Sequence, residues 1–352
     1  MRIFTLKFWI TSLLVACASF WAASAHSQEK SQKKVPLPAV GSVQPLRVLV
    51  VNNPRFAKVD EELAKAILLA ATAETRRHFN LDLSFSAVDF ASTSEILGKM
   101  PGGHRTWALA QSLDLTRNPD MEVLRKSLSG ELYRDGGTAK DIRSFSEKFL
   151  AEQPGDDSDA ALANAIASTQ KKYLDRLRTQ NTVDGKPPLI DDGFGEYLLW
   201  IALGYTRLPY EIVITNQLIA SAEKVGNSVH SALRGGISNG LTNSSRLSKT
   251  GSFSVVSTYP FVNEDETIKA LRNGKTYSVS EWSTYAGALL AHEIGHQLLH
   301  LGHPFENPSC LMRPPARLHF DQWYAALNPA NCRLNSSAAM TPGRTVDYTD
   351  IR

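Results

Sequence analysis

LRVLVV, residues 46–51, is a short apolar run, and the Asn-Asn-Pro at 52–54 that follows it favours a turn. This combination is typical of a buried β-strand. Residues 60–79 then combine good helix formers with apolar positions three and four apart, which predicts a helix. Residues 81–87 alternate apolar and polar side chains, as a half-buried strand does. The β-α-β opening therefore predicts an α/β fold with a mixed sheet.

The middle of the chain changes character. Residues 92 to about 205 show several helical patterns broken by glycine and proline turns, which predicts a helical insertion without a functional motif. Strand patterns return at 210–215 and 253–257. The Gly-, Ser- and Asn-rich segment 235–245 between them predicts a long loop that is either mobile or part of a substrate cleft. We expect residues 46–352 to form one domain.

The N-terminus has the features of an export signal. Residues 1–25 contain two basic residues, a largely apolar run at 8–21 and a small-x-small cleavage pattern at 23–25. Residues 26–45 are polar and lysine-rich, which predicts a flexible leader. We therefore expect an exported chain, periplasmic or secreted, without a membrane span. Two alternatives stay open: an uncleaved anchor, and a lipoprotein attached at Cys17 in a lipobox-like sequence.

Composition sets further limits. The chain has 352 residues, 43% hydrophobic and 21% charged, which suffices for a globular core. Its formal charge of +3 becomes +1 once residues 1–25, with two basic and no acidic side chains, are removed. This balance gives no reason to expect nucleic acid as a partner. Outside the signal, Cys310 and Cys332 form an even pair in a chain expected in an oxidising compartment, which predicts a disulfide.

A second helix carries the chemistry. Residues 282–301 contain no proline and few helix breakers, Ser280 is a suitable N-cap, and Gly302 follows the last apolar position. This predicted helix contains HEIGH, residues 292–296. The motif therefore lies on one continuous helix.

The spacing of this motif suits a metal ion. His292 and His296 are four residues apart, so they project from the same helix face and their imidazole nitrogens can converge on one zinc ion at about 2.0–2.1 Å. Glu293 points toward the open coordination position, where it can accept a proton from a zinc-bound water. We expect His292 and His296 to be metal ligands and Glu293 to be the catalytic carboxylate.

A zinc site needs a third protein ligand, and His300 and His303 compete for this role. His300 lies eight residues beyond His292, about 12 Å along a continuous helix. His303 follows the break at Gly302, where the chain can fold back toward the metal. We favour His303 and keep His300 as the alternative. Two downstream carboxylates are further alternatives: Glu306 and Asp321.

The stretch 292–303 resembles the zincin metallopeptidases, and more narrowly the metzincin clan, whose pattern H-E-x-x-H-x-x-G-x-x-H precedes a Met-turn. Cys310-Leu311-Met312 is similar to the C-x-M turn of archaemetzincins. The resemblance implies a zincin-like domain with a helical insertion, and an edge strand at 210–215 or 253–257. It also implies roles for five residues: His292, His296 and His303 as ligands, Glu293 as catalytic carboxylate and Met312 beneath the metal.

The sequence departs from this family pattern at two points. Leu299 occupies the glycine position, and six residues instead of five separate His296 from His303. The further cysteines that archaemetzincins use for a second, structural zinc are also missing. We therefore expect one zinc ion.

The predicted function is hydrolysis of peptide bonds in a peptide or protein substrate by a zinc-activated water, with Glu293 as general base. Tyr324 is a candidate hydrogen-bond donor, with a packing aromatic as the alternative. Two other functions stay open. One is a non-catalytic zincin-like binding module, and the other is a periplasmic hydrolase of cell-wall peptides.

Overall fold

A computed structural model describes the strand-and-helix framework of the chain. The described residues are 35–36, 42–99, 102–103, 143, 150–177, 209–217, 219, 236–239, 253–264, 266–299, 301, 304, 307–315, 318–332 and 345–346. The predicted signal at 1–25 and most of both the leader at 26–45 and the insertion at 92–205 lie outside them.

Five strands form one mixed sheet in the order β3-β2-β4-β6-β5. Four of them are parallel, and β5 runs antiparallel to β6 at one edge. The predicted α/β fold class with a mixed sheet is confirmed. The strands are β2 (Val43–Asn52), β3 (Asp82–Ser92), β4 (Ile212–Thr215), β5 (Gly236–Asn239) and β6 (Phe253–Ser257). Two further short strands, β1 (Val35–Pro36) and β7 (Thr345–Val346), pair with each other.

The strand positions correct two expectations. β4 and β6 are interior strands, so the prediction of an edge strand at 210–215 or 253–257 is wrong; the edges are β3 and β5. β5 lies within 235–245, which was predicted to be a loop. Its four residues, Gly236–Asn239, show no strand pattern in the sequence. They form a strand through their antiparallel pairing with β6. β2 also begins at Val43, inside the predicted leader, where it pairs with the start of β3.

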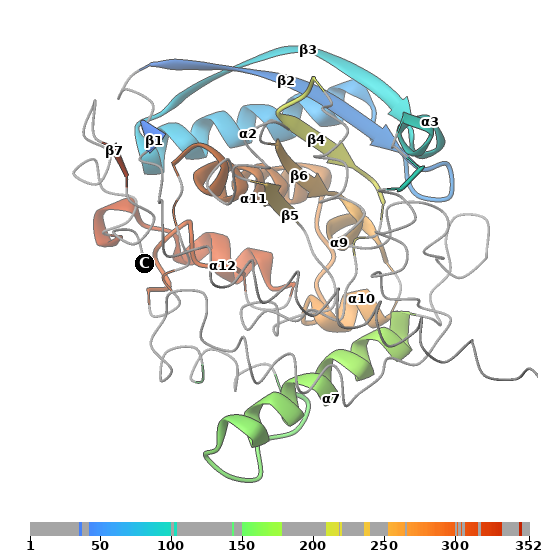
Figure 1. The fold of residues 1–352 in the computed structure, drawn as a ribbon, viewed down its shortest axis with the longest axis vertical. Coiled ribbons are helices and arrows are strands. Elements are labelled where there is room, and N and C mark those ends of the chain that lie inside the picture. The colour runs from blue at the N-terminus through green and yellow to red at the C-terminus, as the bar shows by residue number, and fades with distance from the viewer. Residues whose placement is uncertain are drawn as a thin grey trace, which may run out of the picture.

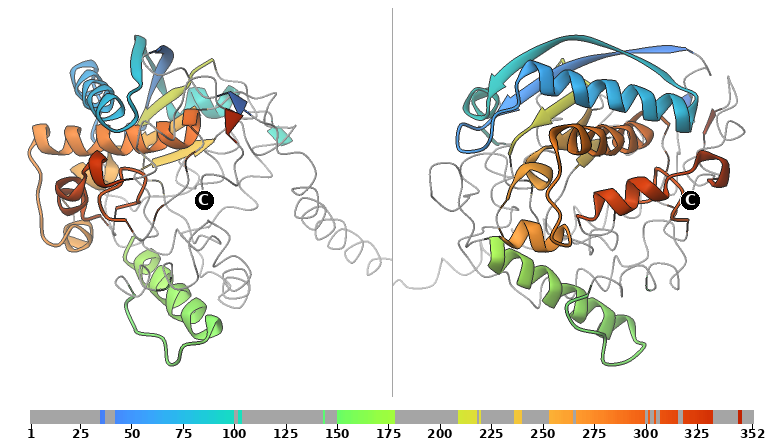
Figure 2. Two further views of the ribbon diagram at one scale, coloured as in Figure 1. Left: turned by 90° about the vertical axis from the view of Figure 1, so that its left-hand side faces the viewer. Right: turned by 180° about the vertical axis from the view of Figure 1, so that it is seen from behind.

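Two long helices cover one face of the sheet. α2 (Glu61–Phe79) begins at Asp60, whose carboxylate accepts a hydrogen bond from the Leu63 amide at 2.9 Å. α11 (Val279–Leu299) lies beside α2 (Figures 1 and 2). The helices approach closely at Gly287, where a Cβ atom would lie 2.7 Å from the Ile67 carbonyl oxygen. The main hydrophobic core lies between this helix pair and the sheet.

The remaining helices are shorter or lie apart. The predicted helices at 94–97 and 159–177 correspond to α3 (Thr93–Lys99) and α7 (Asp159–Leu177). In Figure 1, α7 lies far from β2 and β3. α9 (Tyr259–Val262) and α12 (Phe320–Ala326) contact α11. The other short helices are α10 (Glu266–Leu271), which lies near one end of α7 in Figure 1, and the 3₁₀ turn η6 (Pro329–Asn331). Among the described residues, no helix has both the length and the apolar character to cross a membrane.

Candidate metal centre

The helix that carries the motif starts earlier than predicted. The helix begins at Val279, and Ser278 caps it instead of Ser280. The Glu281 carboxylate accepts a hydrogen bond from the Ser278 amide at 2.8 Å, and the Ser278 hydroxyl accepts one from the Glu281 amide at 3.3 Å. This reciprocal pair is a capping box. Both serines suit an N-cap, and only Ser278 has a glutamate three residues later.

The helix also ends earlier than predicted. Its last residue is Leu299, and the Leu301 amide donates a 3.2 Å hydrogen bond back to the Gly295 carbonyl. The prediction that the helix continues to Leu301 is therefore wrong. His300 and His303 both lie outside the described residues, and so does Glu306. The choice of third ligand stays a prediction.

His292 and His296 face each other across one turn of α11. Their Nε2 atoms are 3.0 Å apart, and their rings are nearly perpendicular, with an interplanar angle of 85°. Two zinc–nitrogen bonds of about 2.0–2.1 Å can span nitrogen atoms at this separation. The geometry of this pair therefore fits one shared zinc ion.

Backbone carbonyls orient both imidazole rings. Nδ1 of His292 lies 2.8 Å from the Leu311 carbonyl oxygen, and Nδ1 of His296 lies 2.6 Å from the Leu301 carbonyl oxygen. A carbonyl oxygen only accepts, so each neutral ring carries its proton on Nδ1 and keeps the lone pair of Nε2 for a metal. Such orienting contacts are typical of histidine ligands.

Burial keeps His296 in the form that binds metals. Desolvation lowers the pKa of His296 to about 4, against the smaller opposing effect of its hydrogen bond to Leu301. The imidazole is therefore neutral at pH 7, as a metal ligand must be. His296 itself is half-buried, whereas His292 and Glu293 are buried, with 3% and 6% of their surfaces exposed. The Glu293 carboxylate is therefore largely shielded from hydrogen bonds with bulk water.

A methionine packs under the histidine pair. Met312 is fully buried, and its Sδ lies so close to Gly295 that a side chain at this position would collide with it. The same Cβ atom would lie 3.0 Å from Cζ of Phe79 at the end of α2. Glycine inside the motif therefore lets the Met312 turn and α2 approach the helix between its two histidines.

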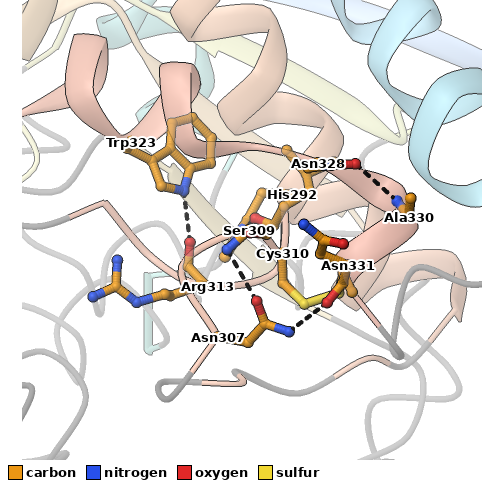
Figure 3. Close-up of a disulfide and its surroundings, with 11 residues drawn as sticks. His292, Asn307, Ser309, Cys310, Arg313, Trp323, Asn328, Ala330 and Asn331 are labelled. Carbon is orange, nitrogen blue, oxygen red and sulfur yellow. Dashed lines mark hydrogen bonds between the residues drawn. A yellow bond between two sulfur atoms is a disulfide. The ribbon is translucent and has the colours of Figure 1, made fainter.

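A disulfide closes the turn that holds Leu311 and Met312. Cys310 and Cys332 are joined as predicted, with Cα atoms 4.9 Å apart (Figure 3). Trp323 donates an indole N–H bond of 2.7 Å to the Arg313 carbonyl just after the turn. Figure 3 places His292 directly behind this segment.

One buried contact that ties α11 to the sheet was not predicted. The Ser254 hydroxyl on β6 donates a 2.6 Å hydrogen bond to the side-chain oxygen of Gln297, whose amide group donates at 3.3 Å to the Glu211 carbonyl. Gln297 directly follows His296, so these bonds hold the second histidine over the start of β4 and β6. A glutamine followed directly by the apolar Leu298 and Leu299 is the signal that was available in the sequence.

Two other predicted candidates have structural partners. The Tyr324 hydroxyl donates a 2.8 Å hydrogen bond to Glu74 on α2, and its ring lies 5.5 Å from that of Tyr285. These contacts match the packing alternative for Tyr324. Asp321 accepts a 3.2 Å hydrogen bond from the Tyr277 hydroxyl. Within the described part of the chain, no group of three or more His, Cys, Asp or Glu side chains is placed to hold a metal ion.

Comparisons with known proteins add little. No family model matches this chain, and no curated protein sequence matches it significantly. Among solved structures, the chain is similar to a zinc-dependent peptidase from Methanocorpusculum labreanum, with 14% identity over 83% of this chain and 99% of the other. The TM-score of 0.34 is too low to establish a shared fold.

Proposed function

We propose that this protein is a zinc-dependent peptidase with one zinc ion bound by His292, His296 and His303. The observation that supports it most is the pair of Nε2 atoms 3.0 Å apart on α11, each with its lone pair directed by a backbone carbonyl. Two ring nitrogens in this arrangement are two of the three protein ligands of a hydrolytic zinc site, and the carboxylate at the next position is placed as its general base.

Zinc at this site would lower the pKa of a water molecule to about 7 and polarise the scissile carbonyl. The chain's own residues supply the rest. Glu293 accepts the proton of the attacking water and then passes it to the leaving amine. Glu293 is buried, with 6% of its surface exposed, and this burial shields the carboxylate from bulk water. Leu311 and Leu301 hold the two imidazoles through the contacts at Nδ1.

Export belongs to the same proposal. The signal pattern at 1–25 supports it, and the disulfide between Cys310 and Cys332 suits an oxidising compartment, where such bonds persist. Determining the N-terminal residue of the protein recovered from a bacterial periplasm tests this part: a start near His26 is expected, and an intact Met1 would contradict it.

Glu293→Gln tests the peptidase assignment. The amide keeps the size of the side chain but cannot accept the proton, so we expect kcat on a peptide library to fall about 10²–10⁴-fold while zinc content stays near one ion per chain. Metal analysis and cleavage of the library are measured on the same preparation.

The exposed face of α2 offers a matched control, Glu62→Gln, in which the same atom is changed far from the histidine pair. This variant should cleave at the wild-type rate. Wild-type cleavage by zinc-loaded Glu293→Gln would exclude the proposed role. A zinc-loaded wild-type protein that cleaves nothing would favour the non-catalytic binding module.

A further inference from the structure

We propose that the Cys310–Cys332 disulfide is a positioning pair for His292, so that the redox state of this bond controls how tightly the site holds zinc. The inference rests on the proposed function only in naming zinc as the ion. The contacts that carry it are made by the chain itself: they connect the disulfide to His292, and His296 is oriented by a residue outside the loop that the disulfide closes.

The connection runs through two adjacent residues. Cys310 is followed at once by Leu311, whose carbonyl oxygen lies 2.8 Å from Nδ1 of His292. The disulfide therefore restrains the residue next to the acceptor (Figure 3). When that acceptor moves away, the hydrogen bond that favours a proton on Nδ1 is lost. The proton of the neutral imidazole can then occupy Nε2, the atom that faces His296.

His296 depends on a different part of the chain. Its Nδ1 contacts the Leu301 carbonyl, and Leu301 is held by the hydrogen bond from its own amide to Gly295 on the same helix. Neither residue lies in the loop that the disulfide closes between Cys310 and Cys332. Opening the disulfide should therefore disturb His292 and leave His296 as it was.

Other contacts keep the turn folded without the disulfide. The Asn328 amide donates a 2.9 Å hydrogen bond to the Ser309 carbonyl, and the Arg313 amide donates at 3.0 Å to the Cys310 carbonyl. Asn307 adds a 2.8 Å side-chain bond to the Asn331 carbonyl. Reduction should thus loosen the acceptor at Leu311 without unfolding the segment, and zinc binding should weaken instead of vanishing.

The redox step is a thiol–disulfide exchange. Reduction breaks the S–S bond and consumes two electrons and two protons, leaving thiols on Cys310 and Cys332, while a dithiol reductant is oxidised to its own disulfide. Exchange with the oxidised form of the dithiol runs the same step in reverse: the two thiols give up two electrons and two protons to it, and the S–S bond forms again. The change at the zinc site is therefore reversible.

The first test reads the ring protons directly. The metal-free protein is labelled with ¹⁵N-histidine, and the ring nitrogens are observed by NMR in the oxidised wild type, in the wild type reduced with a phosphine, and in Cys310→Ala/Cys332→Ala. We expect His292 to shift from the Nδ1–H toward the Nε2–H tautomer in the last two samples and His296 to keep its proton on Nδ1. Phosphine treatment of Cys310→Ala/Cys332→Ala is the control for the reductant itself and should change neither histidine further.

Two results would overturn the inference. If neither histidine changes, the disulfide does not position His292. If both histidines lose the proton on Nδ1, the loss of the disulfide acts on the whole helix end and is not selective. Because the assay uses metal-free protein, either outcome is distinct from a failure of the peptidase proposal.

Zinc affinity supplies the second test. Losing an outer contact to a histidine ligand typically weakens metal binding 10–100-fold, so we expect the zinc dissociation constant of Cys310→Ala/Cys332→Ala to rise at least about tenfold in competition with a chromophoric chelator. An unchanged constant contradicts the inference.

A third measurement needs only the wild-type chain and stays informative if the double variant does not fold. Coupling between sites is reciprocal, so zinc must stabilise the disulfide by the factor that the disulfide gives zinc. A tenfold effect corresponds to a reduction potential about 30 mV more negative in the zinc-loaded protein. An equal or less negative potential would overturn the proposal.

Discussion

At the scale of single residues, His292 and His296 gain their chemistry from backbone atoms that lie outside the motif in the sequence and next to the two rings in the fold. His292 is oriented by Leu311, nineteen positions later, and His296 by Leu301, just past the end of its helix. Gly295 between them admits Met312. Each of these contacts acts on a ligand through its second nitrogen or its neighbouring backbone, which is how outer contacts tune metal sites.

The third ligand is a prediction at this scale. Removing a ligand costs more affinity than removing an outer contact, so His303→Ala should lower zinc affinity by well over 10–100-fold and bring the zinc content below one ion per chain. His300→Ala, the matched control, should retain one ion. Zinc content after dialysis, measured by atomic emission, separates the two. The reverse pattern would assign the ligand to His300.

At the scale of elements, the site depends on how closely two helices pack. α11 lies against α2 at Gly287 and Gly295, and Gln297 fastens its end to β4 and β6. Phe79, the last residue of α2, packs against Gly295. The helix that carries the histidines is thus held on two sides, and its rigid position keeps the two Nε2 atoms at a fixed separation.

Gly287→Ala should lower the free energy of unfolding by about 1–2 kcal/mol. The added Cβ would collide with Cβ of Ala70 and with the backbone at Ile67, and overpacking of this kind costs about 1–3 kcal/mol. The better helix propensity of alanine returns only part of this cost. Urea unfolding followed by circular dichroism measures the change.

Gly98→Ala in α3 is the matched control, because a Cβ there meets nothing within 4 Å. It should leave stability unchanged or raise it by up to about 1 kcal/mol. An equal effect of the two substitutions would show that the close contact between α2 and α11 does not limit packing.

At the scale of the whole molecule, a polar network joins the layer of α2 to the segment below the histidines. Buried Glu74 accepts the hydrogen bond of Tyr324 on α12, and Arg77 donates to the Leu327 carbonyl at 3.3 Å. The next residue, Asn328, bonds to Ser309 beside the disulfide. Helix α2 and the segment that contains the disulfide and α12 are therefore coupled, and they should unfold together.

Glu74→Gln tests this coupling through pH. Burial by itself raises the pKa of Glu74, but hydrogen bonds from His78 and Tyr324 outweigh it and lower the pKa below 4.5. A lowered folded-state pKa stabilises the protein above the unfolded-state value, and this contribution is lost as pH falls through the folded-state pKa. The variant should be less stable than the wild type by about 1–3 kcal/mol at pH 7.

The difference in unfolding free energy between Glu74→Gln and the wild type should shrink below about pH 4.5, as measured by urea titrations at several pH values. Glu62→Gln, on the exposed face of α2, should stay within about 0.5 kcal/mol of the wild type throughout. A difference that is constant with pH would mean that the charge of Glu74 does not contribute.

Local sequence patterns predicted the secondary-structure elements more accurately than the pairing between these elements. The periodicity of residues 60–79 and the apolar run at 253–257 gave correct elements, because side-chain spacing reflects which face a segment buries. β5 escaped prediction because its four residues become a strand only by pairing with β6. The cap of α11 was misplaced because Ser278 and Ser280 are both suitable by residue type, and Glu281 decides between them.

The sequence by itself determined the α/β class, the helix that carries His292, Glu293 and His296, and the pairing of Cys310 with Cys332. These features follow from spacing of 3.6 or 2 residues, and from an even number of cysteines, which are properties of the chain before it folds. The tertiary structure alone decided which carbonyls orient the two imidazoles and which residue packs under them. Backbone oxygens are the same at every position, so only the path of the folded chain selects Leu301 and Leu311.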